Sequence, residues 1–522
     1  MTKQESENNN EDVSGKGRLL RNVITSWGAY LIFIVSGFVM PRLISDNVGQ
    51  EALGVWDFSW AFVNYLSLSY PGIGTALDRF VPRYITKKEY KKLSETISSV
   101  ILIQFVVGVV SLLITIIVSS LTPYLFADTL KEHTETARWI ILFLGGSFAL
   151  EMFFDTSRGL ITGSHRWDLH NAISAVSRTS SVGGMMLALL LGGGLVEIAI
   201  VYFIVTFLTM LSRFAIARKV CSEARFSIKA ARWTRAKEML YFGLKGMVIN
   251  MPAIILIQSV NIAVVASLGP AALAVFTRPV SLLKYVRTFI SRFTFVLTPI
   301  AGSLQADGKS EELRRFIVST TRYGTAISLP IVIYLAMFGD FLIELWMGPE
   351  YVNWELIIIL SLGSIATISQ QTVVRIVIGM NMHGKLGKVS LYLLLVIALI
   401  GATYFYFTGL SLIGAAWFIV IADVISRGLV VPWYACKYLG INIKSYTIEA
   451  FLMPLMAALV FTSILVVART VFADDLLVAF LSGGLVGGIV ILAIYWRFLL
   501  NEEYRNKVRL FVGRKLPRKS GH

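Results

Sequence analysis

Residues 272–300 read ALAVFTRPVSLLKYVRTFISRFTFVLTPI, a segment of membrane-spanning length that contains Arg278, Lys284, Arg287 and Arg292. A cation inside a hydrocarbon-spanning helix costs roughly 2.5–3.5 kcal/mol on insertion scales, so four cations need a compensating environment. At about 100° per residue, these cations share one broad arc with the hydroxyl side chains, while most of the apolar side chains occupy the rest. The segment therefore predicts a spanning helix whose polar arc faces water, protein or an anionic ligand. A basic helix lying on the membrane surface is the alternative.

The rest of the chain has the composition of a membrane protein. Of 522 residues, 56% are apolar and 15% are charged, whereas a soluble chain has about 25% charged residues. Apolar runs of about 20 residues, the length that crosses a bilayer, recur throughout. We place fourteen, at 20–42, 53–77, 95–119, 138–157, 171–193, 195–217, 239–267, 272–300, 316–346, 356–379, 389–408, 412–435, 448–468 and 476–496. The expected fold is an all-α integral membrane protein with about 14 transmembrane helices.

The distribution of basic residues predicts the topology. With a cytoplasmic N-terminus, and with Arg21 at the start of the first span counted as inside, 34 of the 48 Lys and Arg fall on the inside and only two, Lys131 and Arg469, on the outside. This asymmetry agrees with the positive-inside rule, so we expect both termini in the cytoplasm. The net charge of +16 is then mostly topological and, without a recognisable motif, does not indicate nucleic acid binding. Both cysteines, Cys221 and Cys436, fall on the cytoplasmic side, where no disulfide is expected.

An internal repeat divides the predicted spans into two halves. The segment 48–56 resembles 268–276 at an offset of 220 residues, with identities such as Ala52/Ala272 and Leu53/Leu273. Both copies begin on the cytoplasmic side, which makes them parallel repeats related by an axis along the membrane normal. Two such lobes around a central cavity support alternating access.

The repeat and the charge pattern together predict the domain organisation. The predicted parts are a disordered cytoplasmic tail (1–17), an N-terminal six-helix lobe (18–217), a basic cytoplasmic linker (218–238), a C-terminal six-helix lobe (239–435), two additional transmembrane helices (436–500) and a basic cytoplasmic tail (501–522). The last tail can touch anionic membrane lipid.

Cations inside the spans point to an anionic substrate. At ~1.5 Å per residue from the outer end near Ala272, Lys284 lies about 18 Å deep and Arg287 about 22 Å deep. Arg178 and Lys245 lie within spans of the first half and at the start of the second. Intramembrane cations usually face the bundle interior, and Arg suits bidentate phosphate contacts. The predicted substrate-binding residues are Lys284, Arg287, Arg178, Arg278, Lys245 and Arg292.

The acidic residues within the spans are fewer. Asp423 and Arg427 are one turn apart, as are Asp155 and Arg158, and each pair is expected to form an ion pair. Asp57 and Glu151 have no such partner on their own helix and are the candidates for coupling to H⁺ or Na⁺, with an interhelical salt bridge as the alternative.

The pattern indicates no enzyme. There is no GxxxxGK[ST] phosphate-binding loop, no cysteine pair for a metal, and the five histidines fall in predicted loops or at the terminus. We expect no catalytic residue, no metal and no cofactor, so energy would come from an ion gradient or from the gradient of the substrate.

Short motifs near the N-terminus resemble a known family. They comprise Asn22, Trp27, the segment Pro41-Arg42-Leu43-Ile44, the string 49–56 (GQEALGVW) and the string 71–80 (PGIGTALDRF) leading into a basic loop. They resemble the polysaccharide (O-antigen and capsule repeat-unit) flippase family of the multidrug/oligosaccharidyl-lipid/polysaccharide exporter superfamily. The family has an acidic residue before the glycine that matches Gly72, where this chain has Pro71, so no polar role carries over to that position.

The resemblance implies a fourteen-span protein that moves an oligosaccharide on a polyprenyl-pyrophosphate carrier across the plasma (inner) membrane. Its partners would be this lipid-linked glycan, membrane lipid and other polysaccharide-assembly proteins. A peptidoglycan-precursor lipid flippase is the nearest alternative. A cation-coupled multidrug exporter would require acidic cavity residues where this chain has basic ones, and a non-transporting scaffold would have no need for Lys284 and Arg287.

Overall fold

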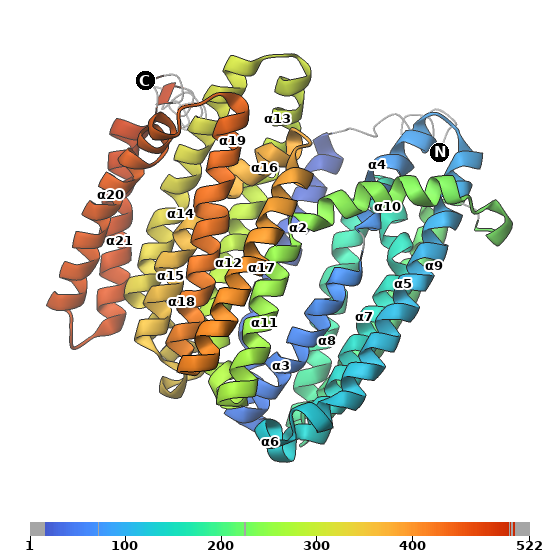
Figure 1. Cartoon of the computed structure of the whole chain (residues 1–522), viewed down its shortest axis with the longest axis horizontal. Helices are drawn as coiled ribbons and strands as arrows, with labels where there is room; N and C mark the ends of the chain where they lie inside the picture. The colour runs from blue at the N-terminus through green and yellow to red at the C-terminus, as the bar shows by residue number, and fades with distance from the viewer. Residues whose placement is uncertain (1–15, 71, 224–225, 501, 503–504, 507–522) are drawn as a thin grey trace, which may run out of the picture. The chain divides into compact units, whose positions relative to one another are not determined.

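The structure, a computed structural model, describes residues 16–500 except 71, 224 and 225, together with 502, 505 and 506. The predicted tails 1–17 and 501–522 lie almost entirely outside the described residues. Among the described residues, every regular element is helical (Figure 1). The elements are α2 (Lys16–Val48), α3 (Gln50–Leu66), η1 (Ser67–Ser69), α4 (Ile73–Thr86), α5 (Tyr90–Leu125), α6 (Ala127–Leu130), η2 (Lys131–His133), α7 (Thr134–Gly163), α8 (Trp167–Leu190), α9 (Leu195–Val220), η3 (Ile228–Ala230), α10 (Trp233–Val248), α11 (Met251–Leu268), α12 (Pro270–Thr294), α13 (Leu297–Ala306), α14 (Ser310–Met347), η4 (Pro349–Tyr351), α15 (Trp354–Ser369), α16 (Gln371–Gly379), α17 (His383–Thr408), α18 (Leu412–Asp423), η5 (Val424–Val430), α19 (Val431–Leu439), α20 (Ile443–Val471), α21 (Leu476–Ile494) and η6 (Tyr495–Leu499).

The membrane character of the fold is confirmed. Among the described residues, twelve helices are long and apolar enough to cross a bilayer. The two other predicted spans correspond to α3, which has 17 residues, and α12, which carries the four cations. A total of fourteen is compatible with this arrangement, and the protein is an all-helical, multi-pass membrane protein.

The second predicted span, 53–77, is not one continuous helix. Its first part belongs to α3 and η1. The helix is broken between Tyr70 and Gly72, and the last residues of the predicted span belong to α4. Tyr70 precedes Pro71 and is extended, as the proline ring requires of the residue before it. Gly72 has a φ of 65°, a left-handed conformation that glycine adopts without a Cβ penalty.

The seventh predicted span, 239–267, is wrong as a single helix. Residues from its first part belong to α10, and the spanning helix α11 starts only at Met251. Pro252 lies in the first turn of α11, where its missing N–H costs no hydrogen bond. The apolar residues at the end of α10 directly precede those of α11, so the sequence pattern showed one continuous apolar run.

The helices pack into two compact units. Unit 1 contains residues 1–277 and 387–415, and unit 2 contains 278–386 and 416–522. These units do not follow the predicted lobes 18–217 and 239–435, because packing groups helices by contact and the repeat groups them by sequence. The lobe boundaries remain a prediction.

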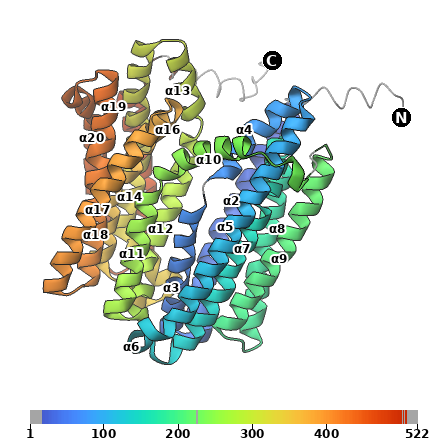
Figure 2. The same ribbon diagram turned by 45° about the vertical axis from the view of Figure 1, so that its right-hand side comes forward.

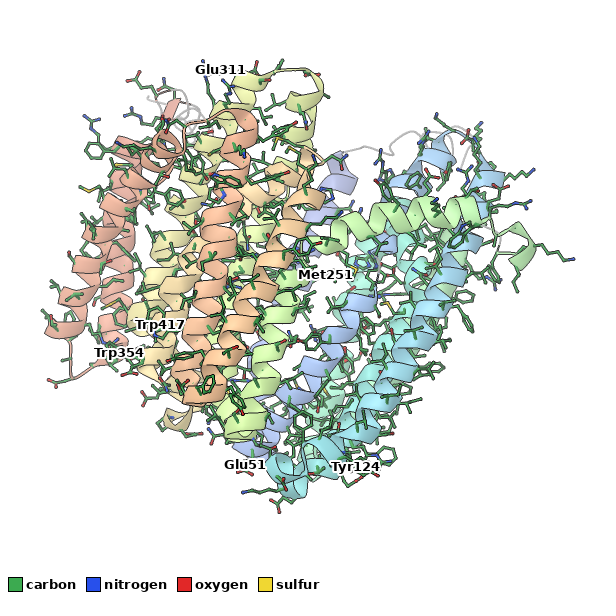
Figure 3. All side chains as sticks on the ribbon, viewed as in Figure 1. Glu51, Tyr124, Met251, Glu311, Trp354 and Trp417 are labelled. Carbon is green, nitrogen blue, oxygen red and sulfur yellow. The ribbon has the colours of Figure 1, made fainter. Side chains whose placement is uncertain are left out.

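In unit 1, α5 lies beside α7, and α7 lies beside α9 (Figures 1 and 2). A core of buried side chains from α4, α5, α7 and α10 closes one end, with Leu77, Leu93, Ile161 and Met239 fully buried. In unit 2, α14 packs on α15 and α20, and α20 on α21. In unit 2, Glu311 near the start of α14 and Trp354 at the start of α15 lie toward opposite ends, whereas in unit 1 Glu51 lies near one end and Met251, where α11 begins, about midway (Figure 3).

In unit 1, a hydrogen bond joins α3 to α12. The Thr277 hydroxyl donates to Asp57 Oδ2 at 2.6 Å, and these two residues directly follow the similar segments 48–56 and 268–276, 220 residues apart. Close approach of α3 to the start of α12 depends on Gly54, because a Cβ there would come within 1.8 Å of the Pro270 carbonyl oxygen.

Candidate functional site

The strongest cationic site lies in unit 2 and centres on Arg287 of α12. Arg287 Nη2 donates to Asp423 Oδ2 at 3.4 Å, and the Thr367 hydroxyl of α15 donates to the same oxygen at 3.0 Å. Asp423 is only 6% exposed, so three helices bring these groups together in the interior. We call Arg287, Asp423, Thr367 and Arg427 the Arg287 cluster.

The predicted ion pair between Asp423 and Arg427 is replaced by the Arg287–Asp423 pair. Asp423 ends α18, and Arg427 lies in the following π-helical segment η5. In a π-helix the hydrogen bonds run from i to i+5, so residues four apart no longer stack as they do in an α-helix. Arg427 still acts electrostatically on Arg287. The Arg287 cluster therefore contains two arginines and one carboxylate, a formal excess of one positive charge.

Further polar groups lie along the same face of α12. Lys284, about one turn before Arg287, is exposed, and Arg292 is exposed as well. Ser291, one turn after Arg287, accepts a hydrogen bond from Arg375 Nη2 of α16 at 2.8 Å. α12 thus presents two exposed cations, Lys284 and Arg292, and one half-buried cation, Arg287.

Arg278 occupies a different environment from the other cations of α12. Its side chain is 1% exposed, and its guanidinium lies 5.7 Å from the centre of the Trp346 ring. A desolvated cation over an indole face is stabilised by the cation–π attraction. This position favours a role in packing α12 against α14 over contact with a ligand.

In unit 1, the candidate acid Glu151 faces two arginines from other helices. Glu151 of α7 interacts electrostatically with Arg213 of α9 and Arg178 of α8. Arg178 also lies 5.2 Å from the centre of the Phe33 ring, and Arg213 donates to Ser174 at 3.1 Å. Both candidate roles of Glu151, in ion coupling and in an interhelical salt bridge, stay predictions. The side chain of Lys245, the remaining cationic candidate, lies outside the described residues.

One turn below Glu151, a network that we call the Asp155 network joins three helices to the break in the second span. Arg158 Nε donates to Asp155 Oδ1 at 2.7 Å, which confirms the predicted pair. Tyr70 and Gln104 donate to Asp155 Oδ2 at 2.6 and 3.1 Å. The Tyr70 hydroxyl also accepts from the Gly74 N–H at 2.7 Å, which satisfies an unpaired donor at the start of α4.

The Asp155 network was only partly visible in the sequence. The i,i+3 spacing revealed the ion pair, but Tyr70 and Gln104 come from distant segments and carry no spacing signal. Nearby, the Thr162 hydroxyl donates to the Asp78 carboxylate. Burial raises the pKa of the Asp78 carboxyl above its ordinary value, and the hydrogen bond from Thr162 opposes this.

An apolar cavity of about 410 Å³ is a separate feature of unit 1. It is lined by residues of α3, η1, α5, α7 and α11, among them Val63, Val118, Ile141 and Ile262. Its volume falls within the range of roughly 300–1,000 Å³ that is typical of ligand pockets. No group of His, Cys, Asp or Glu arranged to hold a metal ion occurs in the part of the chain that the structure describes.

Solved structures of transporters share this fold. An inward-closed structure of the lipid II flippase MurJ matches with a TM-score of 0.66 at 15% identity, covering 93% of this chain and 99% of that one. An inward-facing multidrug resistance MATE family transporter of the MOP superfamily matches with a TM-score of 0.64 at 17% identity, covering 80% and 95%. A MOP superfamily transporter from Pyrococcus furiosus, described as having a binding pocket of reverse polarity, matches with a TM-score of 0.61 at 16% identity, covering 82% and 96%.

At the level of sequence, the chain matches no curated protein. A family model described as polysaccharide biosynthesis protein matches residues 72–355, which is more than half of the 522 residues. This match covers α4 to the start of α15 and includes the α12 cations. The chain therefore belongs to the polysaccharide biosynthesis protein family.

Proposed function

We propose that this protein flips a polyprenyl-pyrophosphate-linked oligosaccharide, a polysaccharide repeat unit, across the plasma membrane by alternating access. The observation that supports this most is the composition of the Arg287 cluster, which contains two arginines, Arg287 and Arg427, and one carboxylate, that of Asp423. Burial of an excess cation in a membrane protein is costly unless a ligand or a partner compensates it. The pyrophosphate or an acidic sugar would supply the missing negative charge.

Other features of each unit fit the same substrate. Lys284 is exposed about one turn from Arg287. The compact ammonium of Lys284 and the planar, bidentate guanidinium of Arg287 are both suited to binding phosphate oxygens. The apolar cavity in unit 1 could take up part of a prenyl chain. Membership of the polysaccharide biosynthesis family supports a glycan carrier over a cationic drug.

The decisive experiment is transport of a fluorescent lipid-linked oligosaccharide in reconstituted vesicles by the double variant Lys284→Gln/Arg287→Gln. Each lost charge-assisted hydrogen bond is worth roughly 1.5–3 kcal/mol, so binding should weaken about ten- to a hundredfold for each residue. Lys309→Gln, at a solvent-exposed lysine outside the spans, is the matched control and should transport normally. Wild-type flipping by a double variant that inserts and folds normally would disprove the cationic mechanism.

The same vesicles distinguish the alternative substrates. The peptidoglycan precursor is also an anionic lipid, and the fold is shared with MurJ. Flipping of the precursor at a higher rate than of a polysaccharide repeat unit would favour the alternative function, whereas accumulation of a cationic dye would favour drug export.

Coupling to H⁺ or Na⁺ is proposed through Asp57 and Glu151. Asp57 accepts a hydrogen bond from the Thr277 hydroxyl, and Glu151 interacts electrostatically with Arg213 and Arg178. Asp57→Asn and Glu151→Gln should abolish the dependence of transport on pH or sodium if either residue carries the ion. Unchanged dependence in both variants would exclude them.

We further propose that both termini and the loop 218–238 are cytoplasmic. The native cysteines are buried, so cysteines introduced into that loop and near Asn47 can be labelled selectively in intact cells. A membrane-impermeant reagent should reach only the site near Asn47, and labelling of the loop from outside would reverse the topology.

A further inference from the structure

The helix α10 has two faces of opposite environment. Its inner face packs against unit 1, with Ala236 at 5% and Met239 at 0% exposure. Its outer face carries a stripe of exposed residues at i, i+4, i+8 and i+11, which we call the outer stripe: Trp233, Lys237, Tyr241 and Leu244. Trp233 is 72% and Tyr241 65% exposed. Large aromatic side chains gathered on one exposed face mark an interaction surface.

The orientation of α10 differs from that of the spanning helices. Within unit 1, α10 runs across α4 and α5 instead of along them (Figures 1 and 2). Its start is anchored to one level of α5, because the Arg232 N–H donates to Ser99 Oγ at 2.9 Å and Arg235 lies 3.9 Å from Glu95. A helix that crosses the spans at a fixed level lies in the plane of the membrane.

The level of this anchor coincides with the lipid headgroups. Glu95 is 30 residues from Leu125 at the other end of α5, which corresponds to about 45 Å of helix. A bilayer measures roughly 30 Å across its hydrocarbon core and 40–45 Å with its headgroups. α10 therefore lies at the headgroup layer opposite Leu125, the side that the charge distribution predicts to be cytoplasmic.

We propose that the outer stripe of α10 binds anionic phospholipid headgroups in the cytoplasmic leaflet. Trp and Tyr are the side chains enriched at the membrane interface, and an in-plane helix with aromatic and basic residues on its exposed face is typical of interfacial binding. Lys237 and Arg232 are exposed and add positive charge beside the aromatic rings. Phe226 and Ile228, in the segment before α10, extend the apolar surface with 51% and 68% exposure.

The C-terminal end of α10 contacts the broken second span, so the proposed lipid-binding helix is packed directly against the transmembrane region. Gly243 packs against Gly72 at the break between η1 and α4, where a Cβ on Gly72 would come 3.0 Å from the Gly243 carbonyl oxygen. Tyr70 of the Asp155 network is two residues from that contact. Lipid binding on α10 thus supports the position of the broken second span.

The first test measures where the outer stripe lies, using the full-length protein in nanodiscs. Because Cys221 and Cys436 are buried, a nitroxide attached to Trp233→Cys reports on one site, and Lys309→Cys serves as the water-exposed control. The label at 233 should collide more with oxygen than with a water-soluble nickel complex. Accessibility like that of the control, or shielding from both reagents by a protein partner, would overturn the proposal.

The second test measures lipid chemistry by native mass spectrometry of the purified protein. Lys237→Gln should reduce retention of phosphatidylglycerol roughly fivefold, the effect of one basic residue near an anionic surface, without changing retention of phosphatidylcholine. Lys309→Gln should leave both unchanged. Equal loss of both lipids, or no loss of either, in a folded Lys237→Gln protein would contradict anionic recognition. These outcomes are independent of which glycan is transported.

Discussion

The Asp155 network and the Arg287 cluster differ in how well the negative charge of their carboxylate is matched by positive charge. In the Asp155 network of unit 1, one carboxylate receives hydrogen bonds from Arg158, Tyr70 and Gln104. In the Arg287 cluster of unit 2, one carboxylate pairs with Arg287, and a second arginine, Arg427, lies close enough to act on Arg287 electrostatically. Both clusters lie where several helices meet, and both join a regular helix to a break or a π-helical segment.

The difference in balance indicates different roles. A buried carboxylate with three donors is satisfied by the protein itself, so the Asp155 network is suited to holding the broken second span in place. An excess of buried cations is not satisfied by the protein alone, so the Arg287 cluster is suited to binding an anion. Comparing variants of the two clusters tests this distinction.

The largest expected effect is on folding, from Asp155→Ala. Removing the carboxylate leaves the Arg158 charge buried without its partner, which costs about 3–5 kcal/mol in the free energy of unfolding. Thermal denaturation of the detergent-solubilised protein measures the loss. Asp155→Asn, which keeps one acceptor oxygen, should lose less, and wild-type thermal stability of Asp155→Ala would remove the structural role of this network.

An effect of opposite sign is expected for anion binding when Asp423 is changed to Asn. Removing the competing negative charge leaves Arg287 and Arg427 free to bind the substrate, and affinity should rise about tenfold, equivalent to roughly 1.4 kcal/mol. Binding of the lipid-linked glycan to the purified protein measures this change. The same substitution at Asp155 should leave affinity unchanged, and equal effects at the two positions would erase the contrast between the clusters.

The smallest expected effect is that of Thr367→Val. The variant removes one hydrogen bond to Asp423 while nearly preserving side-chain shape, and its cost should be about 1 kcal/mol in stability. Denaturation monitored by intrinsic fluorescence measures it. Since the charge count of the Arg287 cluster is unchanged, substrate affinity should stay within about threefold of wild type; a larger loss would make Thr367 itself a ligand-contacting residue.

Much of the fold could be predicted from the sequence because membrane spans are a matter of local composition. A bilayer requires about 20 consecutive apolar residues that satisfy their own backbone hydrogen bonds, so each span leaves its signal in one stretch of chain. The predicted spans 95–119 and 195–217 accordingly lie within α5 and α9. Where composition was continuous but geometry was not, the prediction was wrong: 239–267 merged the in-plane α10 with the spanning α11.

The sequence by itself determined the membrane fold, the repeat, the cations of α12 and the family resemblance, since each depends on residue type and spacing along the chain. Only the tertiary structure decided which charges meet. Arg287 pairs with Asp423 across 136 residues, and Tyr70 reaches Asp155 across 85. Such partners are chosen by how helices pack, and packing brings together residues whose separation in sequence carries no periodic signal.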